Sequence, residues 1–220
     1  MRLSRLILPT FAIALCAPQA AQAATLAPLR ACYRSVDESR RETVRVQGEG
    51  FTPGAVVEVS IDGTIVSTEA RALADGTVSG DVSAPYQARG EQPFTLTATE
   101  RDRPANTASA TSRVTALHLR LKPRKARPSR RVRFIGRGFI DGPEVYGHYL
   151  HGGRLRKTVL LGRPRGACGL IDVKRRQIPI RRPKTGRWTL QVDNQPQYSE
   201  QPVSVRVRVP ITVRQELRRP

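Results

Sequence analysis

The sequence predicts an all-β protein of two tandem β-sandwich domains that follow a cleaved signal peptide. Three observations predict it: a phrase that occurs twice, the periodicity of β-strands, and an N-terminal export signal. Residues 44–54 read V-R-V-Q-G-E-G-F-T-P-G, and residues 132–142, 88 positions later, read V-R-F-I-G-R-G-F-I-D-G. Downstream, F-T-L at 94–96 returns as W-T-L at 188–190. A self-match of this length indicates two copies of one fold.

Residues 1–23 have the pattern of a signal peptide. Arg2 and Arg5 form a positive n-region, and the apolar run that follows is too short to span a membrane. A-Q-A at 21–23 is a small-residue cleavage site, so the mature chain is expected to begin at Ala24. No later segment has the length and apolarity of a transmembrane helix. We therefore expect a secreted protein that is extracellular or associated with the cell surface.

The cysteines predict a bridge between the two copies. Cleavage of the signal removes Cys16 and leaves Cys32 in the first copy and Cys168 in the second. A lipoprotein anchor on Cys16 is the alternative, but Leu15 stands where a lipobox needs a small residue. Two thiols in an exported protein are expected to be bridged, within one chain or between two chains. Two distant cysteines without an adjacent histidine are not expected to form a metal site.

The mature chain has the periodicity of β-strands. Val56–Ile61 and Thr64–Thr68 are β-branched runs on either side of Asp62-Gly63, which is a hairpin signal. In residues 203–209, valines at odd positions alternate with polar residues, which predicts a strand with one buried side. No useful window shows helical periodicity. Further strands are expected at 77–82, 93–98, 107–114 and 144–150.

About seven short strands in roughly 95 residues favour a sandwich of immunoglobulin type. The expected domains are residues 24–116, which are nearly neutral, and residues 117–220, which are strongly basic. Because almost no linker separates them near Ala116, the two domains are expected to form a stiff rod.

The glycines and aromatics of the repeat have mechanical roles. The glycines permit a bulge or a positive φ where a strand ends, while Phe51 and Phe139 enter the core. A phosphate-binding loop would need a helix directly after the glycines, and strands follow instead. Phe94 and Trp188 occupy matching positions, so both are expected to be buried.

The first copy contains Cys32-Tyr33, the phrase V-R-V-Q-G-E-G-F-T-P-G-A-V-V-E-V and Ala74–Thr77. Through these residues it resembles the repeats of secreted bacterial Ig-like domains of the IPT/TIG-like, actinobacterial type. The second copy is similar to a companion domain often paired with them, through residues 145–149, 156–159, 166–169 and 186–191. The resemblance implies adhesive or spacer units without catalytic activity. The glycine phrase is also similar to the neocarzinostatin-type chromophore carriers, but this chain lacks their cysteine pairs within one domain.

The net charge of +20 is unevenly distributed. Residues 24–116 hold 10 arginines, no lysine and 12 acids, a net charge of −2. Residues 117–220 hold 26 lysines and arginines against 6 acids, a net charge of +20, and the two signal arginines offset the −2. A genome-wide preference for arginine does not explain a difference between two halves of one gene. The asymmetry points to a polyanionic partner or surface.

The basic residues also cluster along the second copy. They gather between Lys122 and Arg133 and between Lys174 and Lys184, and two lie in the last strand. Guanidinium groups match phosphate, sulfate and carboxylate geometry, while a solvated, solubilising surface is the alternative. The residues predicted to bind a polyanion are Arg124, Lys125, Arg127, Arg130, Arg131, Lys174, Arg175, Arg176, Arg181, Arg182, Arg206 and Arg208.

The sequence offers little for catalysis or cofactors. His148 and His151 are three residues apart, so on a strand they point to opposite faces and do not share a metal ion readily. His151-Gly152-Gly153 is better interpreted as a hairpin tip. Neither a nucleophile elbow nor a zincin or deaminase signature is present, so we expect no enzyme, no metal and no cofactor.

The leading hypothesis is a non-catalytic, secreted structural or adhesive protein whose basic domain attaches to an anionic polymer of a cell envelope or matrix. The alternative is a module that binds neutral glycan or protein through an exposed patch of Tyr146, Tyr149 and Tyr198. Nucleic acid is not an expected partner, because of export and the lack of aromatic stacking motifs. Nothing in the sequence defines an oligomeric state.

Overall fold

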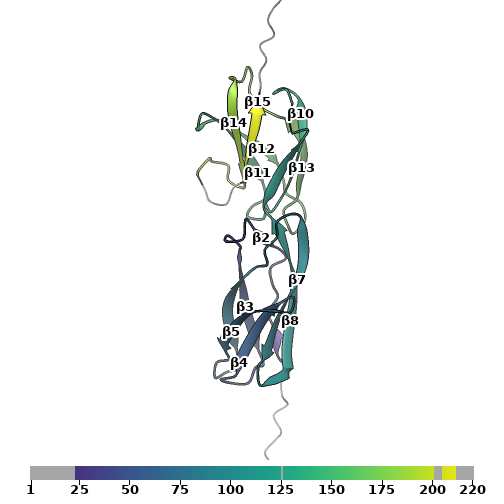
Figure 1. The fold of residues 1–220 in the computed structure, drawn as a ribbon, viewed down its shortest axis with the longest axis vertical. Coiled ribbons are helices and arrows are strands. Elements are labelled where there is room, and N and C mark those ends of the chain that lie inside the picture. Colours follow the sequence, from purple (N-terminus) through teal and green to yellow (C-terminus); the bar gives the residue numbers. More distant parts are fainter. Residues whose placement is uncertain (1–22, 125, 201–204, 212–220) are drawn as a thin grey trace, which may run out of the picture.

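The computed structural model describes residues 23–124, 126–200 and 205–211, and the side chains of 206–211 are not described (Figure 1). Residues 1–22 of the predicted signal peptide, Lys125 and Val203 lie outside the described residues. All regular structure in the described part of the chain is β-strand. That part accordingly holds no helix with the length and apolarity needed to cross a membrane.

The first sandwich has a three-stranded sheet, β1-β3-β6, facing a five-stranded sheet, β2-β8-β7-β4-β5. Strand β2 runs parallel to β8, and the other pairs are antiparallel. This order, with the first strand divided between the two sheets, is the topology of an immunoglobulin-like domain. The strands are β1 Thr25–Leu26, β2 Tyr33–Ser35, β3 Thr43–Glu49, β4 Val56–Ile61, β5 Thr64–Arg71, β6 Val78–Ser83, β7 Glu91–Glu100 and β8 Arg103–Ala116.

The second sandwich repeats the arrangement with a three-stranded sheet, β9-β10-β13, and a four-stranded sheet, β12-β11-β14-β15. Its register places Trp188 opposite Val209 and Leu190 opposite Val207, so the odd-numbered valines of the last strand lie at the positions expected of them. The prediction of two tandem immunoglobulin-like sandwiches is confirmed. The strands are β9 His118–Lys122, β10 Arg131–Arg137, β11 Val145–His151, β12 Arg154–Gly162, β13 Ile171–Arg176, β14 Gly186–Asp193 and β15 Val205–Ile211.

Each sandwich closes its own apolar core between its two sheets. In the second, Phe134 and Phe139 pack with Tyr149, Leu190 and Trp188. In the first, Phe94 packs edge-on against Tyr33, with 5.9 Å between the ring centroids. Phe94 and Trp188 are both buried, as predicted. Further apolar side chains of the two cores include Val44, Val46, Val59, Ile61, Leu96 and Val114 in the first copy and Val132, Val145, Leu161, Ile171, Ile178 and Val192 in the second.

The repeated glycine phrase serves the same purpose in both copies. Gly50 and Gly138 have φ of 81° and 86°, so each allows the chain to turn out of a strand in a conformation that other residues rarely adopt. A Cβ on Gly138 would lie 2.9 Å from the Cα of Leu117, where the chain enters the second sandwich. On Gly50 it would lie 3.2 Å from the Cα of Ala24, where the mature chain is expected to begin. The glycines thus let the incoming segment pack closely on each sandwich.

The predicted hairpins form where turn residues stand. Asp62 and Gly63 join β4 to β5 with φ of 48° and 81°, the positive pair that a two-residue type I′ turn requires. Gly152 and Gly153 join β11 to β12 with φ of 59° and 77°, so the sequence after His151 is a hairpin tip.

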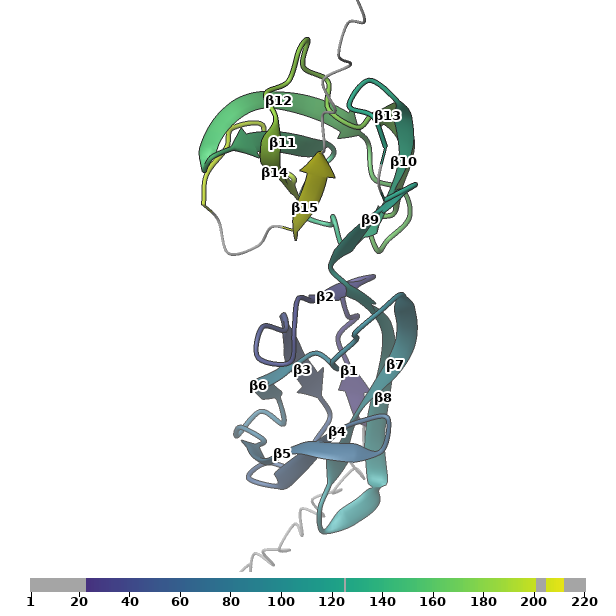
Figure 2. The ribbon, with the colours of Figure 1, turned by 45° about the horizontal axis from the view of Figure 1, so that its top comes forward.

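The two sandwiches are stacked end to end and are joined covalently (Figures 1 and 2). Cys32 and Cys168 form a disulfide with 5.3 Å between the Cα atoms, which confirms the predicted bridge between the copies within one chain. Strand β8 ends at Ala116 and β9 begins at His118. Between them, the amide of Leu117 donates to the carbonyl of Ser35 at 2.8 Å.

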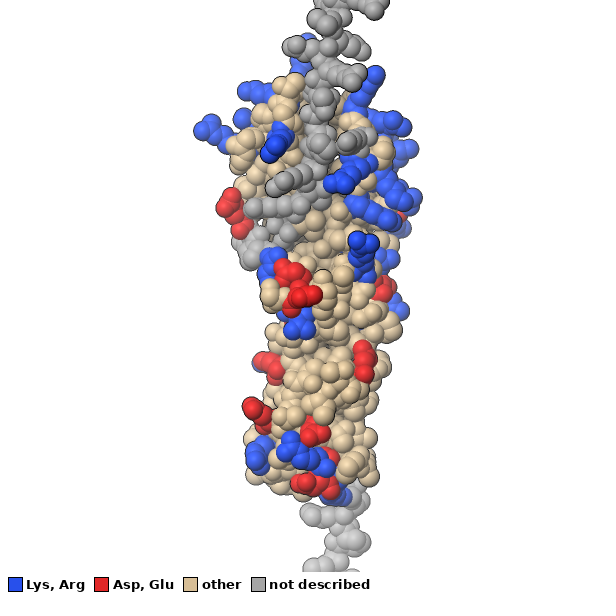
Figure 3. All heavy atoms as spheres, viewed as in Figure 1, with Lys and Arg blue, Asp and Glu red and all other residues tan. Residues whose placement is uncertain are grey.

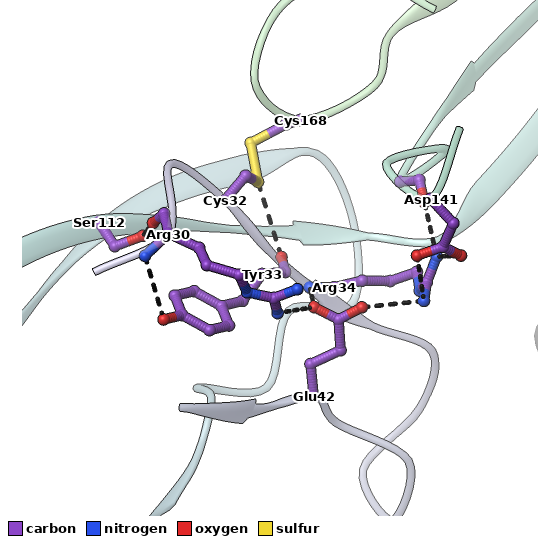
Figure 4. A network of polar contacts seen from close by, with 9 residues as sticks. Arg30, Cys32, Tyr33, Arg34, Glu42, Ser112, Asp141 and Cys168 are labelled. Carbon is purple, nitrogen blue, oxygen red and sulfur yellow. Dashed lines mark hydrogen bonds and ion pairs between the residues drawn. A yellow bond between two sulfur atoms is a disulfide. The ribbon is translucent and has the colours of Figure 1, made fainter. Parts of the chain in front are cut away.

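A buried arginine clamps the same junction (Figure 4). Arg34 is only 6 % exposed. Its guanidinium donates to both carboxylate oxygens of Asp141, at 2.5 and 3.2 Å, and to the carbonyl of Gly138 at 3.3 Å. On the first sandwich it pairs with Glu42 at 2.8 Å. Because planar bidentate pairs are directional, this contact fixes orientation as well as distance between the sandwiches.

Candidate polyanion-binding surface

Basic side chains gather on the outer face of the sheet β9-β10-β13. Figure 3 shows them over the part of the second sandwich where Figure 1 places β10 and β13. We call this surface the basic face. It consists of Arg120, Lys122, Arg131, Arg133, Arg137, Lys174 and Arg176.

Strand alternation creates the basic face. Along β10, Val132 and Phe134 point into the core, so Arg131, Arg133 and Arg137 stand on the opposite side. Leu119 and Leu121 on β9 are buried in the same way and leave Arg120 and Lys122 outside. Because the apolar residues of β9 and β10 are buried, the basic residues that alternate with them all face solvent on the same side of the sheet.

Cross-strand register brings the cations side by side. Arg133 lies between Lys122 on one side and Lys174 on the other, and Arg131 is the partner of Arg176. Directly opposed residues on neighbouring strands have Cβ atoms about 4.5–5.5 Å apart, and like charges at that separation repel. An anion lying across the sheet would relieve this repulsion.

Few carboxylates neutralise the basic face. Arg133 donates to both oxygens of Asp172, at 2.6 and 2.5 Å, and these hydrogen bonds lower the pKa of that carboxyl group. Arg137 pairs with Glu91 of the first sandwich. Within the described part of the chain, no ion pair involves Arg120, Lys122, Arg131, Lys174 or Arg176, and these five remain available to a ligand.

A groove extends the basic face to the junction of the two sandwiches. Its volume is about 730 Å³, and Arg89 of the first sandwich forms part of its wall. His118 lies in the same groove beside Arg120 and Arg137. Burial lowers the pKa of His118, and the two arginines lower it further, against a backbone hydrogen bond at Ala116 that raises it. The imidazole is therefore held neutral in a cationic environment.

The predicted basic residues are only partly brought together. Arg131, Lys174 and Arg176 lie on the basic face. Arg124, Arg127 and Arg130 are exposed in the segment that connects β9 to β10, and Arg181 and Arg182 are exposed between β13 and β14. Arg206 and Arg208 are in β15, opposite Gln191 and Thr189, and thus in the other sheet of the sandwich. Lys125 lies outside the described residues.

Arg175 differs from its neighbours in the predicted cluster. It is opposite Val132, whose side chain is in the core, so its position in β13 is on the inner side of the sheet. It is nevertheless exposed, because this end of the sandwich is open.

Four members of the basic face were not among the predicted binding residues: Arg120, Lys122, Arg133 and Arg137. The signal was present in H-L-R-L-K at 118–122 and R-V-R-F-I-G-R at 131–137, where every second residue is apolar or glycine. The prediction missed this alternating pattern because it grouped cations that are neighbours in sequence rather than cations on the same side of a strand.

The two histidines of the hairpin have separate structural partners. His148 is buried, with Nδ1 2.9 Å from the hydroxyl of Thr158 and Nε2 3.2 Å from a carboxylate oxygen of Asp193. His151 donates from Nε2 to the carbonyl of Thr185 at 2.9 Å, and its ring contacts that of Trp188 at a tilt of 45°. His151 contacts Trp188 on the core side of the sheet, whereas His148 contacts Asp193 on the other side. The two imidazoles therefore point to opposite faces of β11.

The three tyrosines proposed as an alternative patch do not form one. Tyr149 is buried in the core at 1 % exposure. Tyr146 is half-buried and donates its hydroxyl to Glu144 at 2.5 Å, while the half-buried ring of Tyr198 packs on His148. Because Tyr149 is in the core, the three side chains do not form one exposed aromatic patch.

Several solved structures are similar to this chain. The tetra-tandem repeat in the extending region of a large adhesion protein is 18% identical, with 84% of this chain and 47% of that chain covered and a TM-score of 0.30. The adhesin InvE of Yersinia pseudotuberculosis is 12% identical, with 84% and 57% covered and a TM-score of 0.32. SGBP-B of Bacteroides ovatus, solved with a mixed-linkage heptasaccharide, is 14% identical, with 80% and 40% covered and a TM-score of 0.32.

This chain thus spans about half of the first and second of these proteins and less of the third. No family model and no curated protein matches the chain. TM-scores near 0.3 do not by themselves establish a shared fold. The assignment of immunoglobulin-like sandwiches therefore rests on the strand order described above.

Proposed function

We propose that this protein is a secreted, non-catalytic adhesive or spacer protein whose basic face attaches it to an anionic polymer of a cell envelope or matrix. The observation that carries the proposal is the register of β9, β10 and β13, which aligns cations from three strands on one side of one sheet. An inter-domain disulfide is typical of proteins that reside in an oxidising compartment, which supports export of residues 24–220 after cleavage of the predicted signal.

A linear polymer suits this surface better than a compact ligand. The basic face continues into the junction groove, so its cations are spread over a long, open surface rather than converging on one point. Arginine predominates, and its planar fork pairs with phosphate, sulfate or carboxylate groups. The first sandwich, residues 24–116, carries no comparable excess of cations and is proposed to act as a spacer.

Binding is expected to weaken steeply with salt. If the five cations without ion pairs contact duplex DNA as a model polyanion, log K should fall with log salt at a slope of about −4 to −5, because each neutralised phosphate contributes about −0.9. A sparser polymer such as heparin or teichoic acid should give a shallower slope. The measurement is a salt series of dissociation constants for the mature protein, residues 24–220, with each polymer.

Charge-matched variants locate the site. Changing Arg131, Lys174 and Arg176 to glutamine should flatten the DNA slope by about 2.7, three contacts at 0.9 each. Changing Arg154, Arg156 and Lys157 to glutamine removes the same charge from β12, on the other sheet, and should leave the slope nearly unchanged. Arg206→Gln with Arg208→Gln tests β15 separately. Equal losses from all three sets, or binding that ignores salt, would contradict the proposal.

Binding is also expected to strengthen as the pH falls. His118 is neutral in the free protein because its pKa is lowered, and apart from Asp172 the charged groups that line its groove are cations, namely Arg89, Arg120, Lys122, Arg133 and Arg137. A bound polyanion offsets these cations and raises the pKa of His118, so binding takes up a proton. The gain in affinity is complete below the pKa that His118 has in the free protein. It is absent above the pKa that His118 has in the complex.

One added charge about 4 Å from an anion is worth about 1 kcal/mol in water, or about fivefold in affinity. Dissociation constants for heparin at pH 5 and pH 8 should therefore differ by up to about this factor in the wild type, and His118→Gln should abolish the difference. A pH dependence that survives in His118→Gln would assign the effect to the polymer or to another group.

A further inference from the structure

The second sandwich has a pocket beside the basic face, with which it shares Arg131 and Arg176. It lies between β12 and β13, the edge strands of the two sheets, and has a volume of about 560 Å³. Tyr149 lines its inner end, and Val159, Leu160 and Pro179 provide apolar walls. Arg131, Arg175 and Arg176 line the remainder together with Ser129.

Comparison of the two copies shows what opens this pocket. The equivalent valines Val44 and Val132 have Val82 and Arg175 as their cross-strand partners, so Arg175 occupies the place of Val82. The equivalent leucines Leu96 and Leu190 likewise have Ile61 and Tyr149 as partners. Ile61 and Val82 are buried together in the core of the first copy. Apolar core residues have thus been exchanged for a phenol and a guanidinium at two facing positions.

The hydroxyl of Tyr149 is a buried hydrogen-bond donor for which the described residues provide no acceptor. The side chain is buried, and within the described part of the chain its oxygen has no hydrogen-bond partner. Burial raises the pKa of Tyr149, so the phenol keeps its proton and is a donor at every physiological pH. A buried donor without an acceptor costs free energy, and buried polar groups without partners are rare in native proteins. An acceptor in the pocket would supply the missing partner.

Arg175 supplies positive charge to the same space. It stands at an inward position of β13, and among the described residues its guanidinium donates one hydrogen bond, to the carbonyl of Lys174 at 3.3 Å. Among the residues that the structure describes, no carboxylate lines the pocket. The pocket therefore combines a buried neutral donor, an inward cation and apolar walls, and its volume is within the range of about 300–1,000 Å³ usual for small-molecule sites.

We propose that this pocket binds a small amphipathic anion, whose negatively charged oxygens contact Arg175 and the hydroxyl of Tyr149 while its hydrocarbon part lies against Val159, Leu160 and Pro179. The head group is a carboxylate or a phosphate monoester, since guanidinium pairs with either. Arg131 and Arg176 belong to both surfaces. Tyr149 and Arg175 do not belong to the basic face, so variants of these two residues test the pocket separately from polymer attachment.

The test is calorimetric titration of the mature protein with decanoate and with decyl phosphate, which distinguishes the two head groups. Decanol and inorganic phosphate serve as probes of the tail alone and the head alone. Saturable binding of at least one decyl anion is expected, at least tenfold tighter than decanol or inorganic phosphate. Equal affinity for decanol would indicate an apolar crevice only, and no saturable binding of either anion would overturn the proposal.

Two variants separate binding from folding. Tyr149→Phe removes only the unpartnered hydroxyl, so the free protein should keep or increase its melting temperature while affinity for the decyl anion falls about tenfold. Arg175→Val restores the residue of the first copy and should weaken binding at least as much. Arg156→Val, on β12 outside the pocket, is the matched control and should bind as the wild type does. Unchanged affinity in both pocket variants would contradict the site, whether or not the polymer binds.

Discussion

Trp188→Ala is expected to lower the free energy of unfolding by about 3–5 kcal/mol, the range for removing a large aromatic side chain from a core. Trp188 is 3 % exposed and packs among the buried residues of the second sandwich. Its ring lies 4.9 Å from that of His151, and its indole N–H donates to the carbonyl of Lys184 at 3.0 Å. The substitution removes these contacts and leaves a cavity between the two sheets.

Denaturant unfolding followed by circular dichroism gives the measurement. Trp188→Phe is the matched control, because the first copy has Phe94 at the equivalent position, and its loss should be less than half that of the alanine variant. An unchanged melting temperature for Trp188→Ala would mean that the side chain contributes little to the core.

Removal of the disulfide is expected to lower the free energy of unfolding by about as much as Trp188→Ala does. Cys32 and Cys168 are 136 residues apart, and the chain-entropy description gives about 4–5 kcal/mol for a loop of that size. Since the bridge couples two sandwiches that have separate cores, the double variant Cys32→Ala, Cys168→Ala should also lose cooperativity and unfold in two steps.

Calorimetry of the double variant, beside the wild type with and without reductant, measures both effects. The reduced wild type should behave as the double variant does, because both keep the Arg34 clamp and lack only the covalent bond. A single transition at an unchanged temperature would show that the clamp alone unites the sandwiches.

Much of the fold could be predicted because its signals are local. Strand β4 has the predicted limits, and Asp62-Gly63 forms the predicted turn, since β-branched runs and a turn dipeptide act over a few residues. The burial of Trp188 could be predicted because Trp188 occupies the position of Phe94 in the repeat. The pairing of Cys32 with Cys168 followed from there being only two cysteines after cleavage, which left no choice within one chain.

The candidate sites were harder to predict because they depend on contacts between distant residues. The Arg34–Asp141 pair joins positions 107 apart, and nothing in either local sequence marks it. The basic face requires the register of three strands, which the sequence alone does not provide. Arg175 was grouped with its surface neighbours because the open end of the sandwich, where an inward arginine can still reach solvent, is visible only in the folded molecule.

The position of the disulfide has a mechanical consequence. When the folded chain is pulled from residues 24 and 211, tension passes from Cys32 directly to Cys168 through the sulfur atoms. The 135 residues between the two cysteines therefore bear no load along the covalent path, and they include β2 to β12. Under stretching, only the short segment before Cys32 and the strands after Cys168 can lengthen. The bridge thus limits how far a tether made of this chain can extend before covalent bonds carry the force.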